Sequence, residues 1–349
     1  MQSKQSKDGK KKFIWTRTWR FVFGSVVWVV LISGLHWWLN FEHGHQKIFK
    51  MGYMPVITNM AAPLLDYAGT KDSDVRFKAL KFSSFAEMGE ALRNDHIQAA
   101  FIIAPLSIVL RQQGADVKVI YIGNRHESTL VTRKDLNIRD IHELAGRTVA
   151  VPMRFSGHNL SLLRLMEEND MRGEINIVEL NPPDMAAALV TGSLDAYYVG
   201  EPFAARTLKN GNANLLFNVE EVWKSFICNL VIVKQSLIDE EPEIVEKFVN
   251  GAVRSGIWAE KHPDEAAEIA AQYWSQPVEL VRYALHASGG RTLYDQYLPK
   301  IEEMQEIADL MVRYKLIDNN KIDGLVDQQF AKNVDAGDVE TIEDILQEN

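Results

Sequence analysis

Residues Leu144-Ala-Gly-Arg-Thr-Val-Ala-Val-Pro-Met-Arg-Phe-Ser-Gly-His-Asn159 predict a buried strand, a turn and the start of a helix. The apolar run Thr148–Val151 predicts the strand, because short β-branched runs bounded by turn residues are typical of buried strands. Ser156 then precedes an apolar periodic segment, which predicts a helix that begins at Gly157. A strand followed directly by a helix is the repeating unit of α/β proteins, so this stretch indicates the fold class.

The same alternation of strands and helices continues on both sides of this stretch. Further predicted strands lie at 48–53, 75–80, 97–104, 117–122, 175–180, 196–199 and 214–217. Beyond an apolar run at 226–233, the sequence turns helical at 243–262, 263–274, 277–287 and 297–315. This order predicts open, largely parallel sheets with helices on both faces. The acidic segment 331–349 is expected to be a loosely held C-terminal tail.

The N-terminal forty residues differ from the rest of the chain in charge and hydropathy. Residues 1–20 carry a net charge of +6, whereas the whole chain carries −9, which leaves −15 for the remainder. Residues 21–39 contain His36 as their only ionisable side chain and are long enough to cross a bilayer core. Tryptophans flank this run at both ends, where interfacial aromatic residues are common. The pattern predicts a basic cytoplasmic segment, a single transmembrane signal anchor in the inner membrane and a body on the periplasmic side.

A cleaved secretory signal is the alternative interpretation of the same run. Signal peptides have an apolar region of roughly 7–15 residues followed by a small-x-small cleavage site. Residues 21–39 form a longer apolar run, and the following sequence has no such site. A retained anchor is therefore the expectation, and a mature chain that begins after about residue 40 would contradict it.

The composition excludes several classes of protein. Cys228 is the single cysteine, so neither an intrachain disulfide nor a multi-cysteine zinc site can form, and no metal site is expected. The acidic balance argues against nucleic-acid binding, which depends on many Lys and Arg side chains. The sequence has neither a phosphate-binding P-loop nor a Gly-x-Ser-x-Gly nucleophile motif, and no cofactor is expected. Cys228 itself is interpreted as a small buried hydrophobic residue rather than a nucleophile.

Several segments resemble, in the same order, extracytoplasmic solute-binding proteins of the nitrate, sulfonate, taurine and bicarbonate ABC-transporter group. Leu144–Pro152 resembles the segment that opens the second lobe of that family, and Ala99–Ser107 resembles its third strand and loop. Gly200-Glu-Pro-Phe203 resembles its Gly-Glu-Pro-aromatic signature. The resemblance covers about residues 47 to 330 and implies a type II periplasmic-binding-protein-like fold, in which two lobes clamp a ligand.

The resemblance also implies a division of the chain and a set of partners. Residues 47–132 and 233–330 would form lobe 1, and residues 133–232 would form lobe 2. The chain would cross between the lobes near 130–134 and 230–234. The expected partners are a small-molecule solute, an ABC permease and its ATPase.

Candidate ligand-binding residues follow the carboxyl ends of the predicted strands, because helix N-termini there present free backbone N–H groups. They are Met54, Pro55, Thr58, Asn59, Pro105, Ser107, Arg154, Ser156, Gly157, His158, Asn159, Glu201 and Phe203. Arg154 adds a planar cation that suits sulfonate, nitrate or bicarbonate, so a small anion is the expected solute. Helix capping is the alternative role for the serine, threonine, asparagine and histidine side chains in this set. For a neutral or cationic solute, Glu201 and Asp184 would be the partners instead.

The sequence therefore predicts a membrane-anchored solute-binding component of an ABC importer and not an enzyme. Two alternatives stay open. One is an enzyme on the same fold, of the type that makes thiamine-pyrimidine or menaquinone precursors. The other is a ligand-binding partner of a membrane sensor. The sequence does not name the solute or the oligomeric state.

Overall fold

The computed structural model describes residues 17–40, 47–69, 74–287 and 291–347, and the chain divides into two compact units, 1–46 and 47–349. The first unit contains helix α1 (Arg17–Asn40), which exposes apolar side chains from Phe21 to Leu35. Among the described residues, no helix is both long and apolar enough to cross a membrane. The anchor predicted at 21–39 is therefore not confirmed, and residues 1–16 of the predicted basic segment lie outside the described residues.

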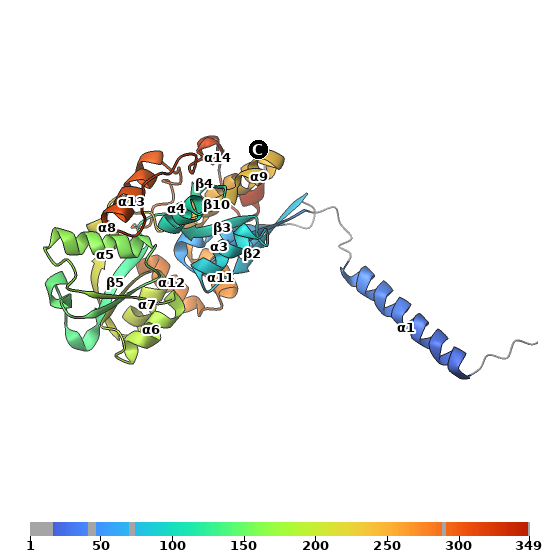
Figure 1. The fold of residues 1–349 in the computed structure, drawn as a ribbon, viewed down its shortest axis with the longest axis horizontal. Coiled ribbons are helices and arrows are strands. Elements are labelled where there is room, and N and C mark those ends of the chain that lie inside the picture. Colours follow the sequence, from blue (N-terminus) through green and yellow to red (C-terminus); the bar gives the residue numbers. More distant parts are fainter. Residues whose placement is uncertain (1–16, 41–46, 70–73, 288–290, 348–349) are drawn as a thin grey trace, which may run out of the picture. The chain divides into compact units, whose positions relative to one another are not determined.

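The second unit contains two five-stranded sheets, each of which forms the centre of one lobe (Figure 1). The first sheet has the order β2-β1-β3-β10-β4, and its strands are β1 (Lys47–Tyr53), β2 (Val75–Lys81), β3 (Ala99–Ile103), β4 (Val117–Ile122) and β10 (Asn229–Lys234). The second sheet has the order β7-β6-β8-β5-β9, and its strands are β5 (Ser128–Arg133), β6 (Thr148–Val151), β7 (Asn176–Glu179), β8 (Ala196–Gly200) and β9 (Ala213–Asn218). The two-sheet α/β architecture predicted from the alternating pattern is confirmed.

In each sheet, one strand runs antiparallel to both of its neighbours. β10 lies between β3 and β4, and β5 lies between β8 and β9. These are the two strands that the chain forms immediately after it passes from one lobe to the other. The remaining pairs, β1 with β2 and β3 and β6 with β7 and β8, are parallel.

The lobe boundaries lie earlier in the chain than the sequence predicts. Residues 123–127 and 223–228 connect the two sheets, whereas the crossings were expected near 130–134 and 230–234. Residues 128–132 therefore belong to the second lobe and residues 229–232 to the first. The physical reason is pairing: β5 forms the ladder between β8 and β9, and β10 forms the ladder between β3 and β4, so the segments before these two strands are the connectors.

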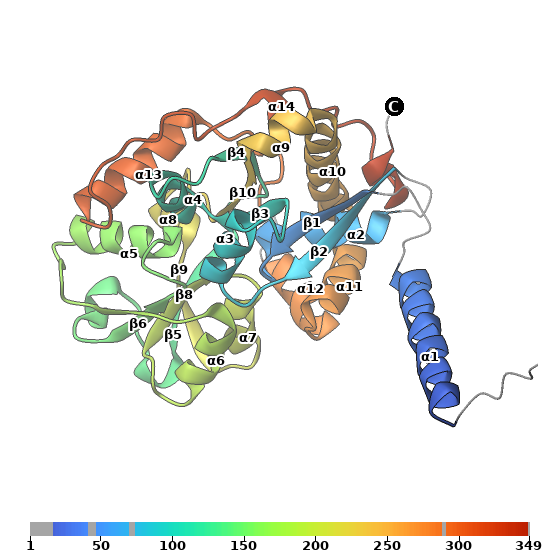
Figure 2. The same cartoon turned by 45° about the vertical axis from the view of Figure 1, so that its right-hand side comes forward.

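Helices cover the faces of both sheets, and the second view separates the two groups (Figure 2). In chain order they are α2 (Ala61–Ala68), α3 (Phe85–Arg93), α4 (Ala104–Gln112), α5 (Gly157–Glu168), α6 (Pro182–Val190), α7 (Phe203–Lys209), α8 (Val219–Val222), α9 (Gln235–Glu240), α10 (Pro242–Lys261), α11 (Pro263–Trp274), α12 (Val278–Ala287), α13 (Ile301–Arg313) and α14 (Gln329–Lys332). Short 3₁₀ helices are η1 (Ile57–Asn59), η2 (Lys134–Leu136), η3 (Ile141–Leu144) and η4 (Glu343–Leu346).

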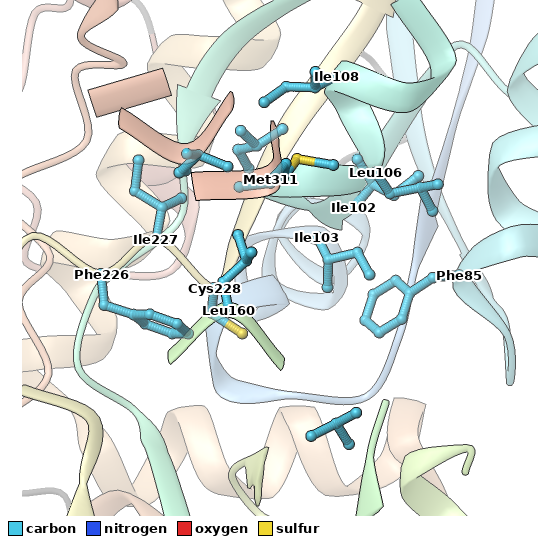
Figure 3. Packing of buried hydrophobic residues seen from close by; sticks show 14 of the residues in the cluster. Phe85, Ile102, Ile103, Leu106, Ile108, Leu160, Phe226, Ile227, Cys228 and Met311 are labelled. Carbon is cyan, nitrogen blue, oxygen red and sulfur yellow. The ribbon is translucent and has the colours of Figure 1, made fainter. Parts of the chain in front are cut away.

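One cluster of buried apolar side chains continues from the first lobe into the second. It joins Ile102 and Ile103 of β3 with Val149 of β6 and Leu160 of α5. The second crossing supplies the residues between them, and Figure 3 shows Phe226, Ile227 and Cys228 next to Leu160. Since burial of apolar surface is the main favourable term in folding, this shared core stabilises contact between the lobes.

Of the C-terminal segment 331–349, the described residues 331–347 do not form the loosely held tail that its acidic composition predicts. Val339 and Ile345 are almost fully buried in the core of the first lobe. A Cβ atom at Gly251 of α10 would come within 3.1 Å of Leu346, so the segment lies directly on this helix. Arg254 of α10 also donates a hydrogen bond to the Gln347 carbonyl at 2.7 Å. The apolar residues among the acidic ones decide the outcome, because they face the core.

Candidate functional site

The two crossings bring a set of polar side chains to the junction between the lobes. The first crossing and the start of β5 contribute Asn124, Glu127 and Ser128, all of which are at least 98% buried. The second crossing contributes Cys228, and α5 contributes His158, which is 2% exposed. Buried polar groups are normally hydrogen-bonded. The partners of each group therefore show which groups are paired within the protein and which remain for a bound molecule.

Two buried carboxylates, Glu127 and Glu201, lie on the second-lobe side of this junction. Glu127 Oε2 accepts a hydrogen bond from the Glu201 backbone N–H at 2.6 Å. A Cβ atom at Gly200 would come within 2.7 Å of Glu127 Oε1, so a glycine is required there. Glu201 accepts from the Thr129 hydroxyl at 3.1 Å and from the Ala205 N–H, in the first turn of α7, at 2.7 Å.

Burial determines the proton affinity of both carboxyl groups. It raises the pKa of Glu127 to about 7 and the pKa of Glu201 to about 7. Repulsion from Glu127 adds to the shift at Glu201, whereas the backbone hydrogen bonds act in the opposite direction. Both side chains therefore change charge near neutral pH.

His158 lies in the first turn of α5 and is surrounded by aromatic rings and short polar side chains. Its Nε2 lies 2.9 Å from Ser128 Oγ, and its ring packs edge-on against Tyr198 and Phe226. Burial lowers the pKa of His158 to about 3, so the imidazole is neutral at physiological pH.

Cys228 lies beside His158 and the carboxylate of Glu127. Its Sγ is 3.9 Å from His158 Nε2 and also faces the Thr58 hydroxyl. Burial raises the pKa of the Cys228 thiol well above its ordinary value. A thiol that stays protonated is a poor nucleophile, and its burial agrees with the interpretation of Cys228 as a small buried residue.

The first lobe closes directly onto this cluster. The Ile57 N–H donates a hydrogen bond to the Glu201 carbonyl at 2.9 Å, which joins the two lobes through their backbones. Asn124 Nδ2 donates to the Ile57 carbonyl at 3.1 Å, and Val56 packs among apolar residues of the second lobe. The structure therefore represents a closed arrangement of the lobes.

Within the part of the chain that the structure describes, three buried oxygen or nitrogen atoms at this junction have no oxygen or nitrogen atom as a hydrogen-bond partner. They are Thr58 Oγ1 from the first lobe, Asn124 Oδ1 from the crossing and His158 Nδ1 from the second lobe. Leaving a buried polar atom unpaired costs about 1–3 kcal/mol. These three atoms are therefore the candidate groups at the junction for contact with a bound solute.

Most of the residues predicted from the sequence are buried near the lobe junction. Met54, Pro55, Thr58, Asn59, Pro105, Ser107, Ser156, Gly157, His158, Asn159, Glu201 and Phe203 are all buried. Several of them have partners within the protein. Ser156 caps α5 by accepting from the Asn159 N–H at 3.1 Å, and Ser107 donates to the Ala104 carbonyl at 2.6 Å. Asn59 Nδ2 donates to the Met54 carbonyl at 2.9 Å.

Gly157 and Phe203 have packing roles. A Cβ atom at Gly157 would come within 2.8 Å of the Phe226 ring, so this glycine permits close contact between α5 and the second crossing. Phe203 lies in the apolar cluster of the second lobe.

The structure does not bring Arg154 into the buried cluster. Its side chain is exposed and its guanidinium lies over the ring of Phe155, 5.0 Å from the centroid. The backbone N–H of Arg154 donates to Glu179 Oε2 at 2.9 Å. Asp184, the alternative partner for a cationic solute, is also exposed, in the first turn of α6. Of the two predicted acidic partners, Glu201 alone lies in the cluster.

Asn124, Glu127, Ser128 and Cys228 are the cluster residues that the sequence does not assign. The available signal is the polar run Asn124-Arg-His-Glu-Ser128, which follows the buried strand β4. Polar residues between buried strands indicate a connector, and the connectors between lobes line the cleft. Because the sequence prediction places the crossings several residues too late, it does not recognise residues 124–128 as a connector between the lobes.

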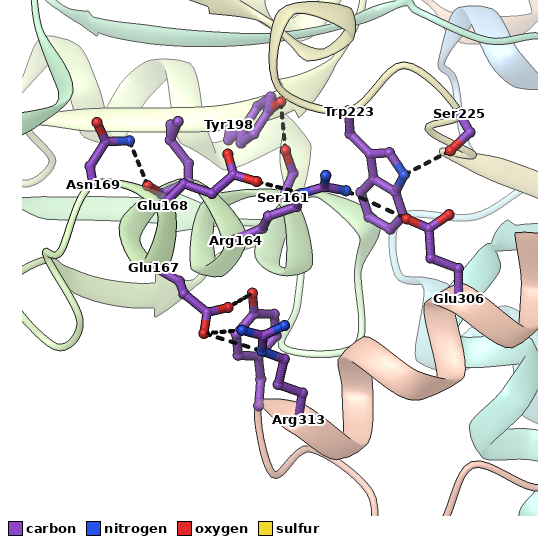
Figure 4. Close-up of polar contacts among 12 residues, drawn as sticks. Ser161, Arg164, Glu167, Glu168, Asn169, Tyr198, Trp223, Ser225, Glu306 and Arg313 are labelled. Atoms are coloured by element: carbon purple, nitrogen blue, oxygen red, sulfur yellow. Dashed lines mark hydrogen bonds and ion pairs between the residues drawn. The ribbon is translucent and has the colours of Figure 1, made fainter.

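A second polar contact joins the lobes away from this cluster, between α5 and α13 (Figure 4). Glu167 of α5 accepts hydrogen bonds from Arg313 Nη2 at 2.5 Å and from the Tyr314 hydroxyl at 2.8 Å. Arg164 of α5 also lies 3.5 Å from Glu306 of α13. These contacts hold the C-terminal part of the first lobe against the second.

Comparisons with known proteins place the chain in a family. The NMT1-like family matches residues 43–274, more than half of the chain. A Bacillus subtilis protein named for binding aliphatic sulfonates is 26% identical over 266 residues, which cover 74% of this chain and 78% of the relative. The taurine-binding periplasmic protein of Escherichia coli is 25% identical over 218 residues, 59% of this chain and 66% of that protein.

The fold has a counterpart among solved structures. The ligand-binding component of an ABC-type import system from Staphylococcus aureus superimposes with a TM-score of 0.75 at 21% identity, covering 84% of this chain and 100% of that one. The curated relatives are named as binding proteins, in agreement with the prediction that the chain is not an enzyme. With the family match across residues 43–274, the chain belongs to the NMT1-like family.

Proposed function

We propose that this chain is the solute-binding component of an ABC importer and that it captures a small polar solute between its two lobes. The observation that carries the proposal is the set of three unpaired buried atoms on Thr58, Asn124 and His158. They come from the first lobe, a crossing and the second lobe. A solute that contacts all three would favour the closed arrangement over an open one, because it gains contacts in the closed form alone.

The relatives support a solute from the sulfonate and taurine group. The two curated relatives are named for binding aliphatic sulfonates and taurine, and the structural counterpart is named as part of an ABC-type import system. Nitrate and bicarbonate, expected from the sequence resemblance, complete the panel of solutes to test. An ABC permease and its ATPase are the partners that this role requires.

The test is calorimetric titration of the purified full chain with taurine, ethanesulfonate, nitrate and bicarbonate. Thr58→Val removes one unpaired hydroxyl with little change in volume and should weaken binding about tenfold. Thr191→Val, at an exposed position on the second lobe, is the matched control and should bind as the wild type does. Equal affinities for the wild type and Thr58→Val would place the solute elsewhere.

Arg154→Ala distinguishes this site from the anion clamp that the sequence predicts. A clamp built on the guanidinium would lose binding altogether when that group is removed. Because the Arg154 side chain is exposed and outside the cluster, we expect the affinity to change by less than about threefold. Loss of binding in Arg154→Ala, with retention in Thr58→Val, would favour the anion clamp.

The second part of the proposal is a retained anchor at residues 21–39, with the binding unit on the periplasmic side. Support comes from the apolar run, from the net charge of +6 in residues 1–20 and from the exposed apolar side chains of α1. The full chain should therefore stay in the membrane fraction after alkaline carbonate washing. A variant that lacks residues 1–40 and carries a cleavable signal should be released by osmotic shock. Recovery of the natural chain in the soluble fraction, beginning after residue 40, would contradict the anchor.

A further inference from the structure

The protons of three side chains at the lobe junction can be assigned from their contacts. Ser128 Oγ lies 3.4 Å from Glu127 Oε1 and 2.9 Å from His158 Nε2. An ionised carboxylate can accept hydrogen bonds but cannot donate one, so in the contact between Ser128 and an ionised Glu127 the hydroxyl is the donor. Ser128 Oγ then accepts from His158, which places the imidazole proton on Nε2.

This assignment leaves His158 Nδ1 with a bare lone pair. Nδ1 is one of the three unpaired buried atoms, and a second, Asn124 Oδ1, is also an acceptor. The third, Thr58 Oγ1, can either donate or accept. The unpaired groups at the junction therefore present mainly acceptors when Glu127 is ionised.

We propose that Glu127 and Ser128 set the tautomer of His158, and that His158 Nδ1 thereby selects solutes that carry an N–H donor. This inference rests on the proposed function, because it assigns the solute of that site. The matching class is a small solute with an ammonium or amide N–H group, such as an aminosulfonate. Acceptor-only anions such as nitrate or a simple alkanesulfonate cannot pair with a bare nitrogen lone pair.

The same contacts make the selection depend on pH. A protonated Glu127 can donate to Ser128, which then donates to Nε2, so that the imidazole proton moves to Nδ1. Burial raises the pKa of Glu127 to about 7. The imidazole proton should therefore move between Nε2 and Nδ1 near neutral pH. The charged and titratable groups that face Glu127 are Glu201, Cys228, Arg291 and Tyr294.

Neighbouring residues influence the ionisation of Glu127, and two titratable side chains contact the ring of His158. The backbone N–H of Glu201 and the Arg291 guanidinium both favour ionisation of Glu127, whereas the Glu127 carboxylate opposes ionisation of Glu201. Around His158, Tyr198 and Cys228 are the titratable groups in contact with the ring, and burial raises the pKa of both well above neutral pH. Neither of them titrates in the range in which Glu127 does.

Glu127→Gln mimics the protonated carboxyl group and tests the relay directly. The Gln oxygen can accept from the Glu201 N–H, and the Gln amide can donate to Ser128, as a protonated Glu127 would. Nitrogen-15 NMR of the histidine-labelled full chain reports which ring nitrogen carries the proton, and His158→Gln assigns the signal. At about pH 8, above the pKa range of Glu127, we expect the Nε2–H tautomer in the wild type and the Nδ1–H tautomer in Glu127→Gln.

The controls keep the NMR experiment decisive. Glu143→Gln, at an exposed position of the second lobe, should leave the tautomer as in the wild type. If Glu127→Gln does not fold, a titration of the wild type from about pH 8 to about pH 6 should show the same exchange of tautomers. A proton on Nδ1 at pH 8 in the wild type would overturn the proposal.

The binding arm compares taurine with ethanesulfonate, which has a methyl group in place of the ammonium group. The wild type at about pH 8 should bind taurine at least about tenfold more tightly, and Glu127→Gln should reduce this preference to about threefold or less. Equal affinities in the wild type would overturn the donor selection while leaving solute binding intact. If the protein binds none of taurine, ethanesulfonate, nitrate and bicarbonate, the proposed function is rejected. The NMR experiment would still show whether Glu127 and Ser128 set the tautomer of His158.

Discussion

At the scale of single residues, burial at the lobe junction changes the chemistry of ordinary side chains. Glu127 and Glu201 acquire pKa values of about 7 because the closed lobes remove water from them. His158 is held neutral for the same reason, with its pKa at about 3. These shifts have opposite effects on stability: protons bound to the carboxyl groups stabilise the folded state at low pH, whereas an uncharged His158 stabilises it at higher pH.

Glu201→Gln is expected to reduce the pH dependence of stability. The pKa of this carboxyl group is about 7 in the folded chain against an ordinary value of 4.5, so the folded state binds the proton more tightly. The resulting stability is complete below about pH 4.5 and is lost as the pH rises through about 7, by roughly 3 kcal/mol. Glutamine does not ionise and keeps an acceptor for the Ala205 N–H. The free energy of urea unfolding should therefore change less between these two pH values.

The comparison of Glu201→Gln with the wild type measures the Glu201 carboxyl group together with its repulsion of Glu127. His158 is present in both proteins, so its opposite contribution between about pH 6.5 and 3 cancels. Glu143→Gln, at an exposed position, should retain the pH dependence of the wild type. Identical pH profiles for Glu201→Gln and the wild type would show that burial does not perturb Glu201.

At the scale of secondary-structure elements, α5 connects the two lobes in two ways. Its N-terminus places His158 and Gly157 against the second crossing, with the Phe226 ring in close contact. Its C-terminal half carries Glu167, which pairs with Arg313 and Tyr314 at the end of α13. The helix therefore contacts the first lobe at both ends of the closed interface.

Glu167→Gln should destabilise the contact between α5 and α13. The Glu167 side chain is 12% exposed and pairs with Arg313 and Arg172, so neutralising it removes partly buried ion pairs. Because Arg313 is 60% exposed and screened by solvent, the expected loss is only about 1 kcal/mol, and it should shrink in high salt. Thermal unfolding at low and high ionic strength measures both effects.

Glu168→Gln is the matched control for Glu167→Gln. Glu168 is the next residue of α5 and pairs with Arg164 within the same helix. A surface pair of this kind contributes about 0.3–0.5 kcal/mol. An equal effect of the two substitutions would show that the contact with α13 adds nothing to stability.

At the scale of the whole binding unit, the C-terminal segment packs back onto the first lobe. Ile345 is 1% exposed and lies in the same core as α10, although acidic residues surround it in the sequence. Lys261 of α10 pairs with Glu340 at 2.6 Å, so the segment has polar as well as apolar contacts. This end of the chain is part of the fold.

Ile345→Ala should lower the free energy of unfolding by about 2–4 kcal/mol, because it leaves a cavity in a packed core. Asp338→Ala changes an exposed residue of the same segment and should have an effect of less than about 0.5 kcal/mol. Urea unfolding of both variants provides the measurement. A loss below about 0.5 kcal/mol for Ile345→Ala would show that the segment is only loosely attached.

The sequence by itself determined the α/β class and most of the strands. These depend on local patterns, such as the buried run Ala99–Ile103 and the capped start of α5 at Ser156. The sequence also predicts Thr58, His158 and Glu201 as ligand-binding residues, since they follow strand ends, and this remains a prediction.

Only the tertiary structure decided which polar residues meet. Ser128 and Cys228 are about 100 residues apart in the sequence, and no local pattern encodes their shared contact with His158. Arg154, the strongest anion candidate in the sequence, lies on the surface, because the turn after β6 directs its side chain over Phe155. Local side-chain chemistry predicts what each residue can do, whereas burial and long-range packing decide which of them share a site and which protonation states they adopt.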